Sequence, residues 1–247
     1  MPQLDKLLTV DCGNSTIDLR RAVDGARLAI ASTALTEAGF VEFVQPVTPG
    51  LVLLASVVAP ATALLQQRFA ALGSRCLVAG IDVPCPLPLH YDTPATLGCD
   101  RWLGALAAHR RFGRAIVVDC GSATTVNVVA ADGTFRGGSI APGLRAMVAG
   151  MVAVTPALPA ARLDATPEVP ARSSQSAVDA GVLLGYCGLV ERLVAEHLRV
   201  AGGPATVVVT GGNAARLLSQ TRLRPQHVPE LVHEGLLHLA ATAPWNC

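Results

Sequence analysis

Two short hydrophobic runs, each ending in an Asp-x-Gly turn, form the first regular pattern along the chain. Residues 7–10 lead into D-C-G-N-S-T, and residues 115–118 lead into D-C-G-S-A-T-T. A second strand-like segment follows each turn, at 17–20 and at 125–129. Because short β-branched runs that end in a tight turn are typical of buried strands, each half of the chain is predicted to begin with strand, turn and strand.

Further apolar segments complete an alternation of strands and helices. A third strand is predicted at 207–209, before the sequence T-G-G-N, and the dipeptide Asp132-Gly133 indicates a hairpin. The uncharged stretch 43–67 contains three prolines and a glycine. It therefore predicts turn, strand, turn and helix, and not a membrane span. Helical periodicity is found at 61–72, 101–111, 176–200 and 229–241.

The recurrence of the first pattern predicts an internal duplication. V-D-C-G occurs at 10–13 and again at 118–121, both times at the end of a strand near the start of a half. We expect an α/β protein with two domains, 1–110 and 111–247, that pack closely because no low-complexity linker separates them.

Composition restricts the classes of function. Hydrophobic residues make up 51% and the net charge is +1, so a large core is expected, but neither nucleic-acid binding nor attachment to an anionic membrane. Lys6 is the single lysine and precedes every glycine, which excludes a P-loop and the protein-kinase lysine. The seven cysteines form no C-x-x-C pair, and the start of the chain is not that of a signal peptide. We expect a reduced, cytoplasmic protein.

The turns are candidates for binding phosphate. A single D-x-G turn is most simply a capped turn, but two copies together with T-G-G favour a nucleotide site. Asp11 is suited to hydrated Mg²⁺, which prefers one or two carboxylates with water and phosphate oxygens. The groups expected to cradle phosphate belong to Gly13, Asn14, Ser15, Gly121, Ser122 and Thr124.

Two other segments carry candidate chemistry. In Y-D-T-P-A-T-L-G-C-D-R-W at 91–102, Asp100 is either a helix cap or a general base, and Arg101 is a possible anchor for a substrate carboxylate. Spacing alone does not decide between these roles. The glycine-rich sequence R-G-G-S-I-A-P-G-L at 136–144 is either a structural loop or the wall of a small-molecule pocket.

Taken in order, D-C-G-N-S, L-G-C-D-R-W, D-C-G-S-A-T-T-V, G-G-S-I-A-P-G-L and V-V-T-G-G-N-A closely resemble type III pantothenate kinases over nearly the whole chain. The resemblance implies two duplicated ribonuclease-H-like domains of the actin-like ATPase superfamily, with an ATP cleft between them. It also implies transfer of the ATP γ-phosphoryl group to the 4′-hydroxyl of pantothenate, the first step of coenzyme A biosynthesis.

The resemblance further implies roles for individual positions. Asp100 matches the proton acceptor, Asp119 the ligand of a monovalent cation (K⁺ or NH₄⁺), and Asp11 the Mg²⁺ site, reached through water. A homodimer is implied, with the active site near the interface. The implied ATP-binding residues are Asp11, Cys12, Gly13, Asn14, Ser15, Thr16, Ile17, Asp18 and Ser122. The implied pantothenate-binding residues are Tyr91, Gly98, Cys99, Asp100, Arg101 and Ser174.

Some positions depart from the family pattern. Ser122 and Ser174 replace threonines, and Asn127 stands where an aspartate is common. Two alternatives are retained: a kinase of another small hydroxyl compound on the same fold, and an accessory or regulatory relative without catalysis. The six histidines form no metal-binding motif, and most are expected at the surface or at helix ends.

Overall fold

The computed structural model describes residues 6–32, 37–44, 46 and 49–242. The chain forms two compact units, one of Met1–Ala107 with Glu230–Cys247 and one of Ala108–Pro229. The first boundary lies near the expected residue 110. The segment after residue 229, which we expected in the second domain, is grouped with the first unit because helix α7 (Leu231–Thr242) packs on that unit's strands.

The first unit is built on a five-stranded mixed sheet in the order β3-β2-β1-β4-β5. Strand β1 pairs antiparallel with β2 and parallel with β4, so the ends of β1 and β4 meet at one edge. The strands are β1 (Leu7–Cys12), β2 (Thr16–Arg21), β3 (Arg27–Ala31), β4 (Leu51–Ser56) and β5 (Arg75–Val78).

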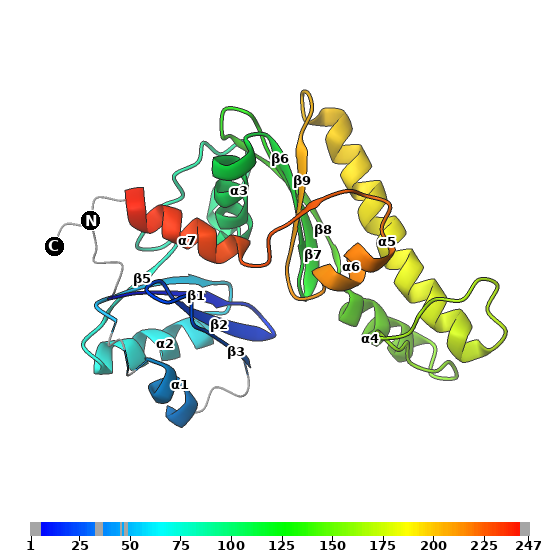
Figure 1. Ribbon diagram of the computed structural model, residues 1–247, viewed down its shortest axis with the longest axis horizontal. Coiled ribbons are helices and arrows are strands. Elements are labelled where there is room, and N and C mark those ends of the chain that lie inside the picture. The colour runs from blue at the N-terminus through cyan, green and yellow to red at the C-terminus, as the bar shows by residue number, and fades with distance from the viewer. Residues whose placement is uncertain (1–5, 33–36, 45, 47–48, 243–247) are drawn as a thin grey trace. The chain divides into compact units, whose positions relative to one another are not determined.

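Alternation along β1 divides its side chains between the two faces of this sheet. Leu8, Val10 and Cys12 are buried in a core formed with α1 (Glu37–Val44) and α2 (Ala59–Ala71). Thr9 and Asp11 therefore lie on the opposite face, where α7 contacts β1 and β4. Figure 1 shows α7 on the other side of the sheet from α1 and α2.

The second unit repeats this topology. Its sheet has the order β8-β7-β6-β9-β10, with β6 antiparallel to β7 and parallel to β9. The matching order and directions confirm the predicted duplication and the α/β class. The strands are β6 (Ala115–Cys120), β7 (Ala123–Val129), β8 (Phe135–Pro142), β9 (Thr206–Thr210) and β10 (Gln226–His227). The helices are α4 (Leu144–Val154), α5 (Ser174–Val200) and α6 (Ala214–Gln220).

Most of the predicted elements are confirmed. The four helical patterns correspond to α2, α3 (Cys99–Phe112), α5 and α7, and the stretch 43–67 contains β4 and most of α2. The Asp132-Gly133 hairpin is closed by a hydrogen bond of 2.9 Å from the Ala130 amide to the Thr134 carbonyl. Among the residues that the structure describes, none of the helices qualifies as a membrane span.

Candidate active site

The first Asp-x-Gly turn is fixed by its own backbone. Asp11 lies near the end of β1, and the Gly13 amide donates to the Thr16 carbonyl at 3.0 Å, which closes the turn. Ser32 supports the turn from outside, since its hydroxyl donates to the Gly13 carbonyl at 3.1 Å. The side chains of residues 14–16 are exposed. A rigid turn with outward polar groups is suited to binding an anion.

The remaining residues of the implied ATP-binding segment, 11–18, do not present exposed side chains at the turn. Cys12 and Ile17 are each 1% exposed and pack in the core, so only their backbone groups are available to a ligand. Asp18 faces the other side and binds Arg27 through hydrogen bonds of 2.8–2.9 Å. His233 lies 3.7 Å from Asp18 and is buried in the first turn of α7, so it is at a helix end, as expected of most histidines, but not at the surface.

Asp100 lies in the first turn of α3, next to a glycine that makes room for it. Its Oδ1 accepts a hydrogen bond of 2.8 Å from the Arg101 amide, and a Cβ at Gly98 would lie 2.5 Å from the same oxygen. Burial raises the pKa of Asp100, against the lowering effect of Arg101. A carboxylate with a raised pKa is a better proton acceptor than an exposed one, so the position suits both roles left open above.

Asp11 and Asp100 are brought together around Cys99. Cys12 and Ser56 are paired at the adjoining ends of β1 and β4, and the Cys99 thiol donates to the Ser56 carbonyl at 3.4 Å. Burial, followed by the charges of Asp100 and Asp11 among other contributions, raises the pKa of Cys99 to about 12. Cys99 is therefore a neutral thiol under the influence of two carboxylates, and not a nucleophile.

Tyr91 holds the guanidinium of Arg101, the residue that follows Asp100, in a fixed position. The Arg101 Nη1 donates to the Tyr91 hydroxyl at 3.2 Å, and its guanidinium lies 5.6 Å from the centre of the Tyr91 ring. Arg101 is only 7% exposed, so its position is fixed by packing. A fixed guanidinium next to a base suits a substrate that carries both a carboxylate and a hydroxyl.

In the second unit, three glycine-containing motifs converge on Asp119. Strands β6 and β9 pair Asp119 with Thr210, and a Cβ at Gly211 would collide with the Asp119 carboxylate. A Cβ at Gly143 would lie 2.5 Å from the carbonyl oxygens of Gly121 and Ser122. The structure thus joins the second Asp-x-Gly turn, the T-G-G sequence and the glycine-rich loop, which the sequence could not place relative to one another.

Side chains behind this turn support it. Asn213 donates from Nδ2 to the Gly121 carbonyl at 3.2 Å, and the Thr124 hydroxyl lies 2.9 Å from that of Tyr186 on α5. Asn127 is buried and donates to the Thr125 hydroxyl at 3.0 Å. Sequence reasoning missed Tyr186 because a tyrosine in an apolar helix gives no sign of its partner.

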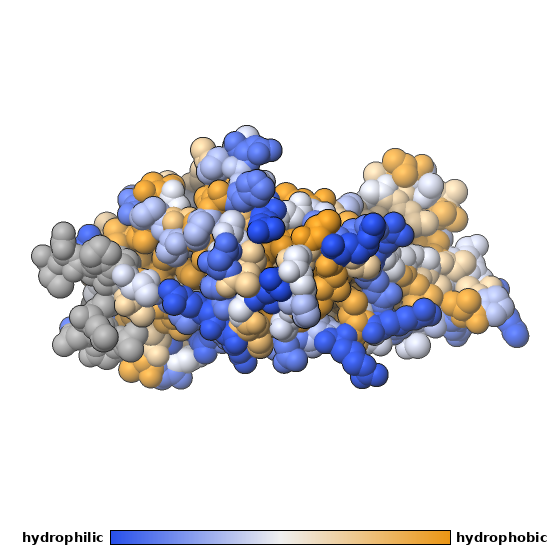
Figure 2. Space-filling view, turned by 90° about the horizontal axis from the view of Figure 1, so that it is seen from above, coloured by the Kyte–Doolittle hydropathy of each residue, from blue (hydrophilic) through white to orange (hydrophobic). Residues whose placement is uncertain are grey.

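Ser174 lies in the first turn of α5, beside an apolar groove. The helix is capped by Ser173 and Ser176 in a reciprocal capping box. In Figure 2, hydrophobic residues are visible at the right of the view, the side on which Figure 1 draws α4 and α5. The groove has a volume of about 680 Å³ and is lined by Met147, Met151, Leu158, Ser174, Ala177, Val178, Gly181, Val182 and Gly185.

Comparison with known sequences identifies relatives of this chain. A type III pantothenate kinase from Rhodopirellula baltica is 44% identical over 161 residues, a match that spans 62% of this chain and only 58% of the relative. One from Dehalococcoides mccartyi is 30% identical over 253 residues and covers 94% of this chain and 96% of the relative.

Solved structures support the fold. A protein described as a Baf family transcriptional activator from Campylobacter jejuni superposes with a TM-score of 0.62 at 20% identity, covering 95% of this chain and 97% of the other. A ROK family glucokinase from Streptomyces griseus gives 0.53 at 12% identity, with coverages of 96% and 99%. Both likenesses concern the fold alone, and they agree with the expected two-domain α/β arrangement. The family model for type III pantothenate kinase matches residues 7–196, and the chain belongs to that family.

Proposed function

We propose that this chain transfers the γ-phosphoryl group of ATP to the 4′-hydroxyl of pantothenate. The observation that carries the proposal is the cluster in the first unit, where the buried Asp100 lies next to the fixed Arg101–Tyr91 pair. Pantothenate has a carboxylate and a hydroxyl, which this cluster matches with a cation and a buried base. Family membership points to the same reaction.

The roles of the residues follow from their chemistry. Asp100 accepts the proton of the attacking hydroxyl, and its raised pKa improves this function. Arg101, held by Tyr91, binds the substrate carboxylate and orients the hydroxyl toward Asp100. The amides and hydroxyls of residues 13–16 bind phosphate oxygens, and the Ser122 hydroxyl of the second Asp-x-Gly turn has the same chemistry. Phosphoryl transfer depends mainly on such positioning and charge neutralisation, so a site without lysine suffices.

The residues present fit the expected cations. Asp11, a carboxylate at a strand end beside an anion-binding turn, suits Mg²⁺, which neutralises phosphate charge when bound. Asp119 and the Gly121 carbonyl suit K⁺ or NH₄⁺, because the absence of a side chain at Gly211 leaves the carboxylate in a cradle that a Cβ would fill. Among the described residues no cluster of three or more His, Cys, Asp or Glu side chains forms a dedicated metal site.

We also infer that the chain is a homodimer that uses the groove between α4 and α5. Ala177, Gly181 and Gly185 recur every four residues on an exposed face of α5, and such small residues let a second helix approach closely. Ser174, an implied pantothenate-binding residue, lines this groove, so a second copy seated there would lie next to it. Cys12, Cys76, Cys85, Cys99, Cys120 and Cys187 are free thiols, which suits a cytoplasmic protein.

A coupled assay tests the function. ADP release is measured with MgATP and pantothenate, first in potassium and then in sodium buffer, and 4′-phosphopantothenate is identified by mass spectrometry. Strong dependence on pantothenate supports the proposal, and activation by potassium supports the role of Asp119. Phosphorylation of glucose or another small alcohol, but not of pantothenate, would refute it. Nucleotide binding without turnover of any acceptor would favour a regulatory relative.

A further inference from the structure

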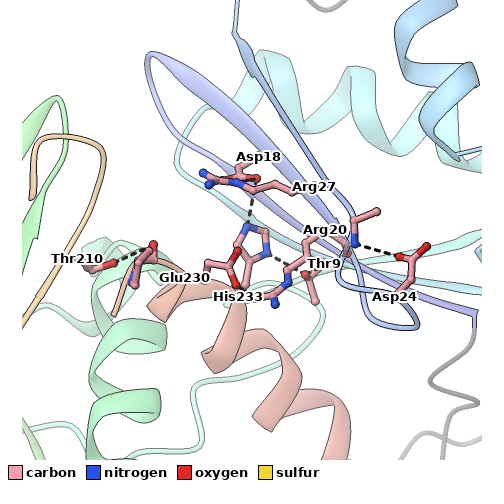
Figure 3. Close-up of polar contacts among 10 residues, drawn as sticks. Thr9, Asp18, Arg20, Asp24, Arg27, Thr210, Glu230 and His233 are labelled. Atoms are coloured by element: carbon pink, nitrogen blue, oxygen red, sulfur yellow. Dashed lines mark hydrogen bonds and ion pairs between the residues drawn. The ribbon is translucent and has the colours of Figure 1, made fainter. Parts of the chain in front are cut away.

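A buried histidine joins α7 to the strand pair that carries the first turn. His233 is 3% exposed, and its Nδ1 lies 2.8 Å from the Thr9 hydroxyl on β1. Its Nε2 lies 3.7 Å from a carboxylate oxygen of Asp18 on β2. Figure 3 marks this contact with a dashed line. This nitrogen is fully buried and makes no hydrogen bond. The ring therefore bridges Thr9 and Asp18.

Asp18 is the direct cross-strand neighbour of Asp11. The register of β1 and β2 pairs Asp11 with Asp18, and both lie on the face opposite the core. Like charges directly across a strand pair destabilise it, and a second carboxylate there also repels an anionic ligand. A nucleotide site at Asp11 thus requires that the charge of Asp18 be compensated.

The compensation comes from two sides. Arg27 on β3 donates through Nε to both oxygens of Asp18, at 2.9 and 2.8 Å, and His233 approaches from α7. Burial of the carboxylate works against ionisation, but the interactions with His233 and Arg27 outweigh it and hold the pKa of Asp18 below its usual value. The nearby Arg20 forms an ion pair with Glu230, so its charge is already matched.

The position of the ring favours a proton on Nε2. A lone pair at that nitrogen would face a carboxylate, whereas an N–H directed at Asp18 gives a buried polar atom an acceptor. The Thr9 hydroxyl serves Nδ1 either as donor or as acceptor, so it is compatible with this arrangement. His233 thus directs an N–H toward Asp18, at a distance longer than that of a hydrogen bond.

We propose that His233 is a positioning residue of the nucleotide site, which holds the Asp18 carboxylate against Arg27 so that the phosphates face the charge of Asp11 alone. This inference rests on the part of the proposed function that assigns MgATP to the first turn. His233 lies beyond residues 7–196, which match the family model, so the family motifs carry no signal for it.

A matched pair of amide substitutions tests this role. His233→Asn keeps an amide near Thr9 but withdraws the donor from Asp18, whereas His233→Gln keeps a donor at the position of Nε2. The dissociation constant of a nonhydrolysable ATP analogue with Mg²⁺ is measured by calorimetry. We expect it to rise about tenfold in His233→Asn and to stay within about threefold of wild type in His233→Gln. Thermal unfolding checks that both variants are folded.

Two further variants separate positioning from docking of the helix. Glu230→Gln breaks the neighbouring ion pair with Arg20 and should leave nucleotide affinity unchanged. In an Asp18→Asn background, His233→Asn should change affinity less than about twofold, because the charge on which it acts is gone. An equal loss in that background, or an equal loss in Glu230→Gln, would show that His233 only docks α7. These measurements do not involve pantothenate, so the proposal for His233 remains testable even if pantothenate is not the acceptor. If the wild-type protein binds no nucleotide, both the proposed function and the role of His233 are wrong.

Discussion

The carboxylate of Asp119 occupies the space that a side chain at Gly211 would need. The two residues lie at the ends of the neighbouring parallel strands β6 and β9, and Gly211 has a φ of +90°. Both the conformation and the close approach favour glycine at this position. The Thr-Gly-Gly turn thereby closes directly over the carboxylate expected to bind the monovalent cation.

Gly211→Ala should therefore damage the cation site. We expect the substitution to destabilise the protein by about 1–3 kcal/mol and to remove the difference in activity between potassium and sodium, because Asp119 has to move. Thermal unfolding and the coupled assay in the two salts measure these effects. Gly212→Ala is the matched control, since a Cβ there meets no atom within 4 Å. Retained potassium activation in Gly211→Ala would contradict the assignment.

Asp100→Asn should separate turnover from nucleotide binding. Loss of the proton acceptor is expected to lower kcat by about 10²–10⁴-fold, the usual range for general base catalysis, while the affinity for MgATP stays near wild type. Steady-state kinetics and calorimetry give the two quantities. Near wild-type turnover with potassium and saturating substrates would show that Asp100 is only a helix cap.

The same substitution should change stability with pH. Because burial raises the folded-state pKa of Asp100, the stability linked to its protonated form is present below pH 3.8 and lost as pH rises through the folded value. At neutral pH the wild type keeps a buried charge, so Asp100→Asn should have the higher Tm. The gain should vanish in acid. A lower Tm for Asp100→Asn at neutral pH would mean that the carboxylate stabilises the fold.

The groove between α4 and α5 gives a prediction about assembly. Gly181→Arg places a large charge in the groove, where a Cβ at Gly181 meets no atom within 4 Å, so the isolated chain should still fold. We expect sedimentation to show a dimer for wild type and a monomer for the variant, with reduced pantothenate affinity. Ala195→Arg, at an exposed position of α5 outside the groove, should remain dimeric. A dimeric Gly181→Arg would place the interface elsewhere.

A buried carboxylate on α5 predicts acid sensitivity of the second unit. Asp179 is 1% exposed and accepts hydrogen bonds from the Arg162 amide at 2.7 Å, the Arg162 Nε at 2.9 Å and Gln175 at 2.9 Å. Burial opposes ionisation, but these bonds hold the pKa of Asp179 below its usual value. Its contribution to stability is therefore present above pH 3.8 and lost as pH falls through the folded value.

Asp179→Asn should lower the free energy of unfolding at neutral pH by about 2 kcal/mol, because charge-assisted hydrogen bonds are lost. Urea titrations at several pH values measure the effect, and the gap from wild type should narrow in acid. Asp24→Asn removes a carboxylate that is 47% exposed and should change stability little. An unchanged gap at low pH would exclude ionisation of Asp179 as the cause.

The periodicity of the sequence predicts most of the fold. Strands ending at Asp11 and Asp119, and the helices between, follow from local patterns of apolar residues, and the repeated turn indicates the duplication. The assignment of α7 to the first unit could not be predicted. It depends on packing against β1 and β4, which are far away in the sequence.

Some residues of the candidate site can also be predicted from local sequence motifs, whereas others cannot. Asp11, Asp100 and Asp119 each stand two residues from a glycine in a local motif, so the sequence reveals them. His233 and Tyr186 act through partners distant in sequence, and the residues around them do not predict those contacts. Their roles follow only from register and burial.

The late position of α7 in the chain has a consequence for synthesis. Residues 108–229 leave the ribosome before α7 exists, so the second unit has its complete sequence first. Until α7 has been made, Thr9 lacks the His233 contact, and the face of β1 that carries Asp11 lacks its covering helix. The order of maturation is therefore expected to run opposite to the order of translation, with the hairpin of β1 and β2 completed last.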